Sequence, residues 1–178
     1  DVFLPLSRLI NMYVTETQSL HRVTTHFLCA SPKKVPYIIG ISGSVAVGKS
    51  TVSRVLQALL SRWENHPKVA LITTDGFLYS NAELESRHMM NRKGFSESYR
   101  VEALLSFLAQ LKSGASSVQA PVYSHHSYDI IPDEVVTIAD PDIVIIEGLN
   151  ILQTSVPSAT HHPHLFVSDF LDFSIFVD

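Results

Sequence analysis

The residues with the clearest chemical signature lie between Gly43 and Ser50, where the chain reads GSVAVGKS. All four fixed positions of the pattern G-x-x-x-x-G-K-[ST] are present. Glycines let a loop curl so that its backbone N–H groups point inward, and Lys49 adds a full positive charge. Such a loop holds the phosphates of a nucleoside triphosphate. The Ser50 hydroxyl is then placed to bind the Mg²⁺ that bridges the β- and γ-phosphates.

The flanking sequence predicts the elements that such a loop requires. Residues 37–42 form an apolar, β-rich run, and beyond the loop apolar residues recur at helical spacing, at positions 52, 55, 56, 59, 60 and 63. The loop is therefore expected between a buried strand and a helix N-terminus, whose dipole adds partial positive charge. The alternative is an ordinary turn with two glycines, and this context favours phosphate binding. The candidate nucleotide-binding residues are Gly43, Ser44, Val45, Ala46, Val47, Gly48, Lys49, Ser50 and Thr51.

Two carboxylates follow two further apolar runs. Asp75 comes after residues 69–73, and Glu147 comes after residues 143–146 in the pattern typical of a Walker-B acid, which holds Mg²⁺ directly or through water. Because parallel strands joined by helices end at one edge of a sheet, Asp75 is expected beside the phosphate loop. There a carboxylate can accept the proton of an attacking hydroxyl. The alternatives are a turn-forming Asp before Gly76 and a buried strand that happens to end in an acid.

Residues 121–129, PVYSHHSYD, combine two tyrosines, two histidines and an acid without helical periodicity. Side chains that both stack and donate hydrogen bonds suit a small polar organic substrate, so we expect a binding loop here. Residues 78–100 are polar and carry four basic side chains, and they fit either a lid over the substrate or a solvated surface loop. These basic residues are Arg87, Arg92, Lys93 and Arg100.

Composition limits the class of protein. The 178 residues, 46% hydrophobic and 17% charged, suit one globular domain over 1–178, with a helical segment at 1–36 and a core at 37–178. A net charge of −4 argues against a nucleic-acid surface, and no run is long and apolar enough to span a membrane. The single cysteine, Cys29, suits a reducing compartment, so we expect a cytoplasmic protein.

The remaining periodicity predicts helices at 3–14 and 101–112, a short helix within 15–36, and further strands at 166–169 and 173–177. Together these elements predict an α/β fold of three layers around a mainly parallel sheet, in the arrangement of P-loop kinases. The chain begins with Asp1 and ends directly after an apolar run, so we expect part of a longer protein. A histidine cluster invites a metal hypothesis, but without regular ligand spacing an exposed loop is favoured; its members are His161, His162 and His164.

From about Leu4 to Asp178 the chain resembles the bacterial type I pantothenate kinases. The segments that carry this resemblance, in the order and spacing of that family, are GSVAVGKST, RVLQALLSRW, LITTDGFL, KGF-x-ESY, APVYSH-x-x-YD, EGLN and FVSDF. The phosphate loop is shared by many kinases. The combination of LITTDGFL with PVYSH-x-x-YD is the specific part.

The resemblance implies ATP-dependent phosphorylation of the primary hydroxyl of pantothenate, with Mg²⁺, as the first step toward coenzyme A. By the same likeness Lys49 would bind phosphate and Asp75 would activate the hydroxyl. Pantothenate would be held by Tyr123, His125 and Tyr128. Arg54 and His125 would contact coenzyme A when it inhibits by competing with ATP, and the expected assembly is a homodimer. Glu147 is the Mg²⁺ candidate from its strand end, with weaker support from the family.

The chain also departs from that family. Ser80 and Ser96 stand where proline is usual, which is expected to loosen residues 78–100, and Arg100 replaces an acid at a helix start. The family's C-terminal part, which closes over the substrate, is absent from this sequence. Relatives of uridine kinase and phosphoribulokinase are therefore retained as an alternative, as is a non-catalytic nucleotide-binding fragment. A sugar phosphate would call for additional Arg or Lys within 121–129, and none is there.

Overall fold

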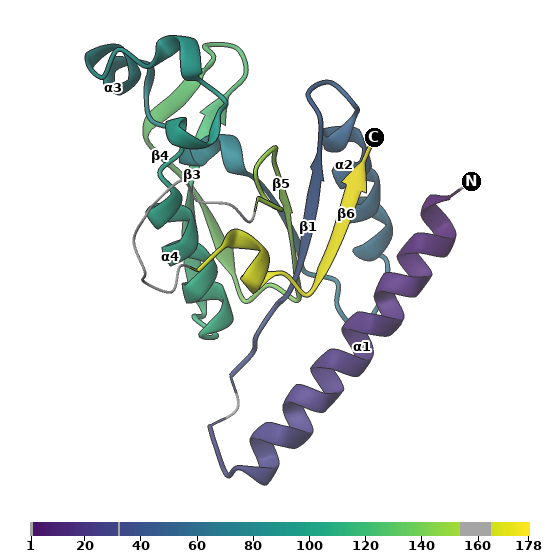
Figure 1. The fold of residues 1–178 in the computed structure, drawn as a ribbon. Helices are drawn as coiled ribbons and strands as arrows, with labels where there is room; N and C mark the ends of the chain where they lie inside the picture. The colour runs from purple at the N-terminus through teal and green to yellow at the C-terminus, as the bar shows by residue number, and fades with distance from the viewer. Residues whose placement is uncertain (1, 32, 154–164) are drawn as a thin grey trace.

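A computed structural model describes residues 2–31, 33–153 and 165–178 (Figure 1). The helices are α1 (Phe3–Phe27), α2 (Lys49–Leu60), α3 (Asn81–Ser86) and α4 (Val101–Lys112). The strands are β1 (Tyr37–Gly43), β2 (Val69–Thr73), β3 (Ser117–Ser124), β4 (Asp129–Ala139), β5 (Ile143–Glu147) and β6 (Phe173–Val177). Short 3₁₀ turns complete the chain as η1 (Thr74–Phe77), η2 (Met90–Arg92), η3 (Ser96–Ser98) and η4 (Val167–Phe170).

Four parallel strands form the central sheet in the order β2-β5-β1-β6. In the register, Ile41 of β1 pairs with Glu147 of β5, and Thr73 of β2 pairs with the same Glu147. The carboxyl ends of the three strands therefore lie at one edge, as predicted. Strand β5 separates β2 from β1, so Glu147 stands on the strand next to the phosphate loop, and Asp75 lies one strand further away.

Alternating side chains bury both faces of this sheet, which confirms the three-layer prediction. On one face Ile39, Ile41, Ile143 and Ile145 pack with residues of α1 and α2, including Ile10, Leu56 and Leu60. On the other face Ile38, Ile72, Val144 and Ile146 pack with α4, with η4 and with an antiparallel hairpin of β3 and β4. Continuous apolar strands are expected for a parallel sheet that is covered on both sides.

Helix α1 is one helix of 25 residues, so the prediction of a helix at 3–14 followed by a separate short one is wrong. Residues 15–27 contain neither proline nor glycine, and nothing in that sequence ends the first helix. Polar contacts tie its second half to the sheet, because Gln18 Nε2 donates to the carbonyl of Asp142 at 3.1 Å. The carboxylate of Asp142 also pairs with Lys34 Nζ at 2.5 Å.

Two other predictions about local structure are wrong. Residues 167–170 form a 3₁₀ turn instead of a strand, because the Asp169 carboxylate accepts from the Phe166 N–H at 2.8 Å and closes a turn. Residues 121–129 are largely the ends of β3 and β4, and the loop between them is confined to 125–128. Pro121 made β3 hard to predict from the sequence, because proline is unusual inside a strand. In the structure it coincides with a shift of register between β3 and β4.

The segment 78–100 is more ordered than its composition indicates. Ser80, which was expected to loosen it, caps α3: its hydroxyl accepts from the Glu83 N–H at 3.2 Å, and Glu83 accepts from the Ser80 N–H at 3.0 Å. Such a reciprocal box satisfies two donors at the helix start. Helix α4 spans 101–112 as predicted. Within the described ranges no helix is long and apolar enough to cross a membrane.

The core makes a prediction about stability. Leu56 is fully buried between α2 and the sheet, so Leu56→Ala removes apolar contacts and leaves a cavity. We expect it to lower the free energy of unfolding by about 2–5 kcal/mol. Met12→Ala is the control, because Met12 is 65% exposed on α1, and its effect should remain within about 0.5 kcal/mol. Urea titration followed by circular dichroism measures both; equal effects would contradict this packing.

Candidate active site

The phosphate loop has the geometry of an anion cradle. Gly48, the residue before α2, has φ of 92°, and Ala46 has φ of 64°, so both lie in the left-handed region. In the part of the chain that the structure describes, the backbone N–H groups of Gly48, Lys49 and Ser50 donate to no other group. These amides stand at the N-terminus of a 12-residue helix. Free donors and a helix dipole together favour a phosphate group here.

The loop lysine and serine face different partners. Lys49 Nζ donates to the Ser44 carbonyl at 2.6 Å, so the ammonium lies against its own loop. The Ser50 hydroxyl donates to Glu147 Oε1 at 2.9 Å. The other carboxylate oxygen, Oε2, lies 2.8 Å from the hydroxyl of Ser53, which is fully buried. Both oxygens of Glu147 are thus in contact with α2.

Ser53 was not among the sequence candidates. It follows Ser50 by three residues, and positions three apart share one face of a helix, so its spacing carried a usable signal. Thr51 and Arg54 are exposed on the same helix, and no polar contact ties either of them to Asp75 or Glu147 in the described part of the chain. They stand beside the loop without joining this network.

The pair of Ser50 and Glu147 suits Mg²⁺, which prefers hard oxygen ligands and leaves room for phosphate oxygens and water. Elsewhere in the described ranges, no three His, Cys, Asp or Glu side chains gather as a metal site. The candidate histidines 161, 162 and 164 lie outside the described residues.

Asp75 begins the turn after β2 and is partly buried. Its N–H donates to Thr73 Oγ1 at 3.3 Å, and its Oδ1 accepts from the Tyr99 hydroxyl at 3.3 Å. Burial raises the pKa of the Asp75 carboxyl; the Tyr99 hydrogen bond and the charges of His125 and Lys49 oppose this shift, while Glu147 adds to it. Asp75 therefore lies within the field of the phosphate loop and of the β3–β4 turn. Tyr99 belongs to the KGF-x-ESY segment, whose role the sequence did not reveal.

Two glycines let the elements of this site approach closely. A Cβ on Gly148 would meet Thr74 Oγ1 at 2.0 Å, so the end of β5 lies against η1. A Cβ on Gly76 would meet the Pro121 carbonyl oxygen at 2.2 Å, so η1 lies against β3. The absence of both side chains brings the strand ends and the hairpin together around Asp75.

The predicted substrate residues come from the hairpin. The rings of Tyr123 and His125 meet edge to face with centroids 5.2 Å apart. Burial and the charges of Asp75 and Asp129 raise the pKa of Tyr123, which places it near Asp75. Tyr128 is 70% exposed, with φ of 51°. The structure thus brings Tyr123 and His125 to Asp75 and leaves Tyr128 at the outer end of the turn.

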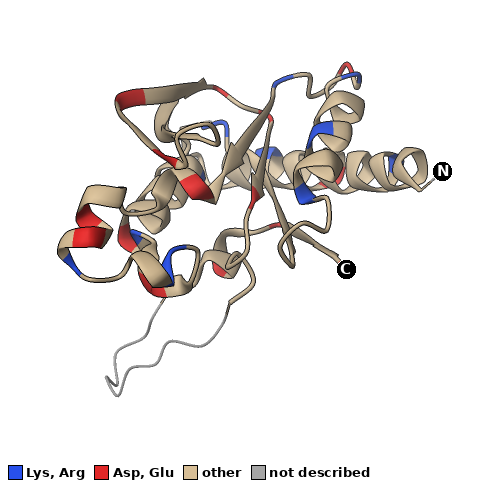
Figure 2. Cartoon of the chain, turned by 90° about the horizontal axis from the view of Figure 1, so that it is seen from above, with Lys and Arg blue, Asp and Glu red and all other residues tan. Residues whose placement is uncertain are grey.

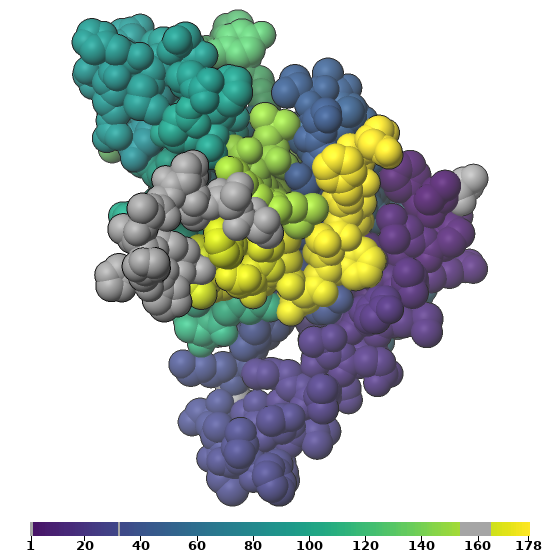
Figure 3. Space-filling model, viewed as in Figure 1, coloured from purple at the N-terminus to yellow at the C-terminus, as the bar shows by residue number. Residues whose placement is uncertain are grey.

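The surface is open around these residues. Figure 3 shows it hollowed between the phosphate loop (blue) and the block of α3 and the hairpin (teal and green). A cavity of about 460 Å³ adjoins the strand ends; its lining includes Ser42, Phe95, Ser96, Asn150 and Phe176. Figure 2 looks onto this edge and shows acidic and basic positions interspersed along the described part of the chain.

The burial of Asp75 predicts a gain of stability when its charge is removed. Its pKa is raised in the folded state, so the ionised carboxylate destabilises the fold at neutral pH. Asp75→Asn keeps the acceptor for Tyr99 and should be more stable than the parent at pH 7. The gain should shrink as pH falls through the raised pKa toward the unfolded value of about 3.9.

Urea titrations at several pH values measure this difference. The control is Glu64→Gln, which neutralises an exposed carboxylate. A gain for Asp75→Asn that is independent of pH, or one equalled by Glu64→Gln, would show that burial of the Asp75 charge is not its origin.

Comparison with known proteins extends this geometry. The pantothenate kinase of Parvibaculum lavamentivorans is 58% identical over all 178 residues, and that of Coxiella burnetii is 60% identical over the same span. The matches cover 55% and 56% of those two proteins, so the chain spans about half the length of the curated relatives it matches.

Solved structures share the fold. A protein from Silicibacter sp. TM1040, assigned as a fructose transport system kinase, matches 82% of this chain and 66% of its own with a TM-score of 0.66 and 27% identity. The D-glycerate 3-kinase of Cryptococcus neoformans has a TM-score of 0.58 at 19% identity, over 82% of this chain and 53% of its own, and shows the fold alone. A model of the phosphoribulokinase/uridine kinase family matches residues 38–178, so the chain belongs to that family.

Proposed function

We propose that this chain is the nucleotide- and acceptor-binding part of a pantothenate kinase, which transfers the γ-phosphoryl group of ATP to pantothenate and gives 4′-phosphopantothenate. The observation that carries the proposal is the position of Asp75, in contact with Tyr99 and within the field of both Lys49 and His125. Lys49 of the phosphate loop and His125 of the β3–β4 hairpin thus both act electrostatically on the Asp75 carboxylate. The names of the relatives at 58% and 60% identity support the choice of acceptor.

On the phosphate side, the free amides of Gly48, Lys49 and Ser50 and the ammonium of Lys49 bind the triphosphate. Ser50 and Glu147 hold Mg²⁺, whose charge neutralises the transferring group when it is bound. In the structure these two side chains hydrogen-bond to each other, so the ligand oxygens are already gathered. Little covalent chemistry is asked of the protein in phosphoryl transfer, and positioning supplies most of the effect.

On the acceptor side, Asp75 accepts the proton of the primary hydroxyl. Burial raises the pKa of the Asp75 carboxyl, which makes it a stronger base than an exposed aspartate, and the hydrogen bond from Tyr99 opposes this rise. Tyr123, His125 and Tyr128 bind pantothenate, whose amide and hydroxyl groups can pair with their polar atoms. The partly buried Tyr123 supplies the inner wall.

Coenzyme A is proposed as a feedback inhibitor that competes with ATP, through Arg54 and His125. Support comes from the exposure of both side chains, one beside the phosphate loop and one on the hairpin turn. We also propose a homodimeric, cytoplasmic protein in the pathway of coenzyme A synthesis. Exposed apolar side chains on α1 favour a protein partner; they include Met12, Tyr13, Leu20, Val23 and Phe27.

The family also contains uridine and phosphoribulo-kinases, and the structure weakens one argument against them. Residues 121–129 contain no Lys or Arg, yet Lys93 reaches this turn and donates to the Tyr128 carbonyl. The positive charge of Lys93 therefore lies near the proposed acceptor site. An activity assay with a phosphorylated acceptor tests this alternative. A non-catalytic nucleotide-binding protein has no need of the Asp75 and Tyr99 pair.

The first activity prediction concerns the acceptor. The complete gene product is given MgATP with pantothenate, uridine or ribulose 5-phosphate, and ADP release is followed. We expect turnover with pantothenate to exceed that with the other two. Preference for uridine would reject the proposed acceptor, and absence of turnover with all three would favour the non-catalytic alternative.

The second concerns the base. Asp75→Asn should lower kcat with pantothenate by about 10²–10⁴-fold, because general-base assistance is lost. The Kd for MgATP should change less than about twofold, since Asp75 does not contact the loop amides. Because the variant is expected to gain stability, lost turnover cannot be ascribed to unfolding. Undiminished turnover would remove Asp75 from this role.

The third concerns pH. The acid limb of kcat/KM should lie above the ordinary aspartate value of about 3.9, because activity falls as the carboxylate of Asp75 is protonated. Tyr99→Phe removes a hydrogen bond that lowers this pKa, so the limb should move to higher pH. Tyr79→Phe, whose hydroxyl does not contact Asp75, is the control. An acid limb that Tyr99→Phe leaves in place would contradict the assignment.

A further inference from the structure

Three polar contacts reach the turn between β3 and β4 from a different part of the chain, and a fourth joins the two residues that make them. The Asp129 Oδ1 atom accepts from the Asn81 N–H at 3.0 Å, and Asn81 Nδ2 donates to the Tyr128 carbonyl at 3.4 Å. Lys93 Nζ donates to Asn81 Oδ1 at 2.5 Å and also to the Tyr128 carbonyl. Asn81, Lys93 and Asp129 are thus linked by hydrogen bonds around the backbone of Tyr128.

The turn needs such support. Tyr128 has φ of 51°, a left-handed conformation that costs a side-chain-bearing residue about 1–2 kcal/mol. Asp129 Oδ1 also accepts from the Ile130 N–H at 2.8 Å, so the same carboxylate holds the start of β4. The turn itself is exposed and has little packing of its own. External hydrogen bonds therefore keep it in this conformation.

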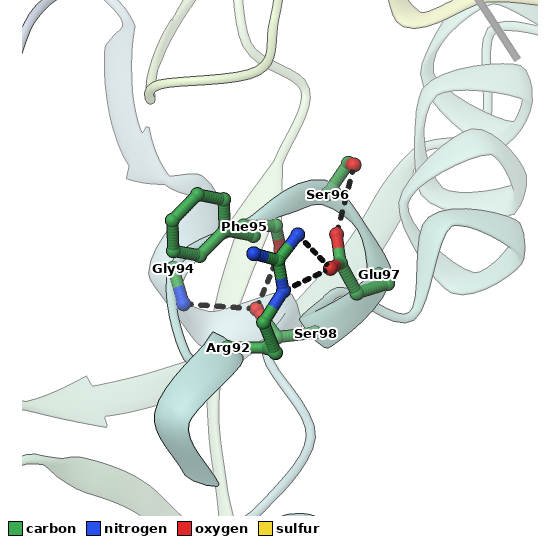
Figure 4. Close-up of polar contacts among 6 residues, drawn as sticks. All are labelled: Arg92, Gly94, Phe95, Ser96, Glu97 and Ser98. Carbon is green, nitrogen blue, oxygen red and sulfur yellow. Dashed lines mark hydrogen bonds and ion pairs between the residues drawn. The ribbon is translucent and has the colours of Figure 1, made fainter. Parts of the chain in front are cut away.

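The residues on either side of Lys93 are tied together by polar contacts (Figure 4). The Arg92 guanidinium pairs with Glu97 Oε1 at 2.5 Å and stands over the Phe95 ring, 4.1 Å from its centroid. The Gly94 N–H donates to Ser98 Oγ at 2.9 Å, and Ser98 Oγ donates to the Phe95 carbonyl at 2.6 Å. These contacts brace the backbone on both sides of Lys93. Its ammonium lies 5.6 Å from the centre of the Tyr123 ring.

The turn connects directly to the acceptor wall. In the ladder, Ser124 pairs with Asp129 and Tyr123 pairs with Ile130, so a displacement of the turn displaces Tyr123 and His125. Both of these side chains act electrostatically on Asp75 or are acted on by it. The position of the turn therefore sets the space between the wall and the carboxylate.

We propose that Asn81, Lys93 and Asp129 form a clamp that fixes the 125–128 turn and thereby positions Tyr123 and His125 against Asp75 for the acceptor alcohol. The claim that these residues fix the turn follows from the contacts alone. The claim that they position Tyr123 and His125 for the acceptor alcohol rests on the proposed function. Lys93 is a positioning residue here, because its ammonium is engaged by two oxygens of the protein and acts through the turn.

The first readout needs no substrate. Hydrogen exchange of the backbone amides at 124–130 is compared in the complete gene product and in Lys93→Met, which keeps the length of the side chain and removes its donors. We expect exchange about tenfold faster in this turn, with the amides at 45–50 unchanged. The control is Lys68→Met, an exposed lysine on the opposite edge of the sheet. Unchanged exchange at 124–130 in Lys93→Met would overturn the clamp.

The second readout is kinetic. Lys93→Met and Asn81→Ala should each raise the KM for pantothenate about tenfold, and the double variant should add little, because both break one unit. The kcat at saturating pantothenate and the KM for ATP should stay within about twofold. Lys93→Arg, which keeps a cation and donors, should recover most of the affinity.

The outcomes separate the two claims. Faster exchange with an unchanged KM for pantothenate supports the clamp and overturns its acceptor role. A loss of kcat at saturating pantothenate, with KM unchanged, overturns the positioning role and assigns Lys93 to the reacting groups. If Lys93→Met and Asn81→Ala change the KM for pantothenate in a strictly additive way, the two residues do not act as one unit, which overturns the clamp. No turnover in the parent protein defeats the proposed function while the exchange result still decides the clamp.

Discussion

The carboxyl ends of β1, β5 and β2 meet at one edge because these strands run parallel and in register, and everything at the site depends on that alignment. Glu147 ends the middle strand and is hydrogen-bonded by Ser50 and Ser53 of the helix that follows β1. Asp75 lies in the turn that follows the outer strand β2, and Gly148 lets this turn lie against β5. Two carboxylates, Glu147 and Asp75, are thus held one strand apart by backbone geometry.

The alignment has a free-energy cost at Asp75. A carboxylate at the rim of the sheet is partly removed from water, and burial raises its pKa. The Tyr99 hydroxyl, presented from a bend that precedes α4, offsets part of that rise. When ionised, a carboxylate held this way destabilises the fold and is a stronger base than an exposed one.

The acceptor side is assembled from segments that are remote in sequence. Helix α3, the bend around Lys93 and the β3–β4 turn contact one another through side chains and carbonyl groups at positions 81, 93, 128 and 129. Gly76 allows the hairpin to lie against η1 through Pro121. The phosphate loop itself lies between β1 and α2 and is built from local sequence, whereas Glu147 and the hairpin reach the site through long-range contacts.

The sequence by itself determined the parts whose signals are local. The phosphate loop, β1, α2 and α4 follow from glycine positions, apolar runs and helical spacing within a dozen residues. It also placed Asp75 and Glu147 at strand ends. Only the tertiary structure decided the strand order and the pairing of β3 with β4 across Pro121. The continuation of α1 past residue 14 was open to the sequence, since residues 15–27 contain neither proline nor glycine. Tyr99 and Lys93 acquired roles only in the tertiary structure, because a hydroxyl or an ammonium takes part in a site only when folding brings its partner, 24 or 35 residues away, within hydrogen-bonding distance.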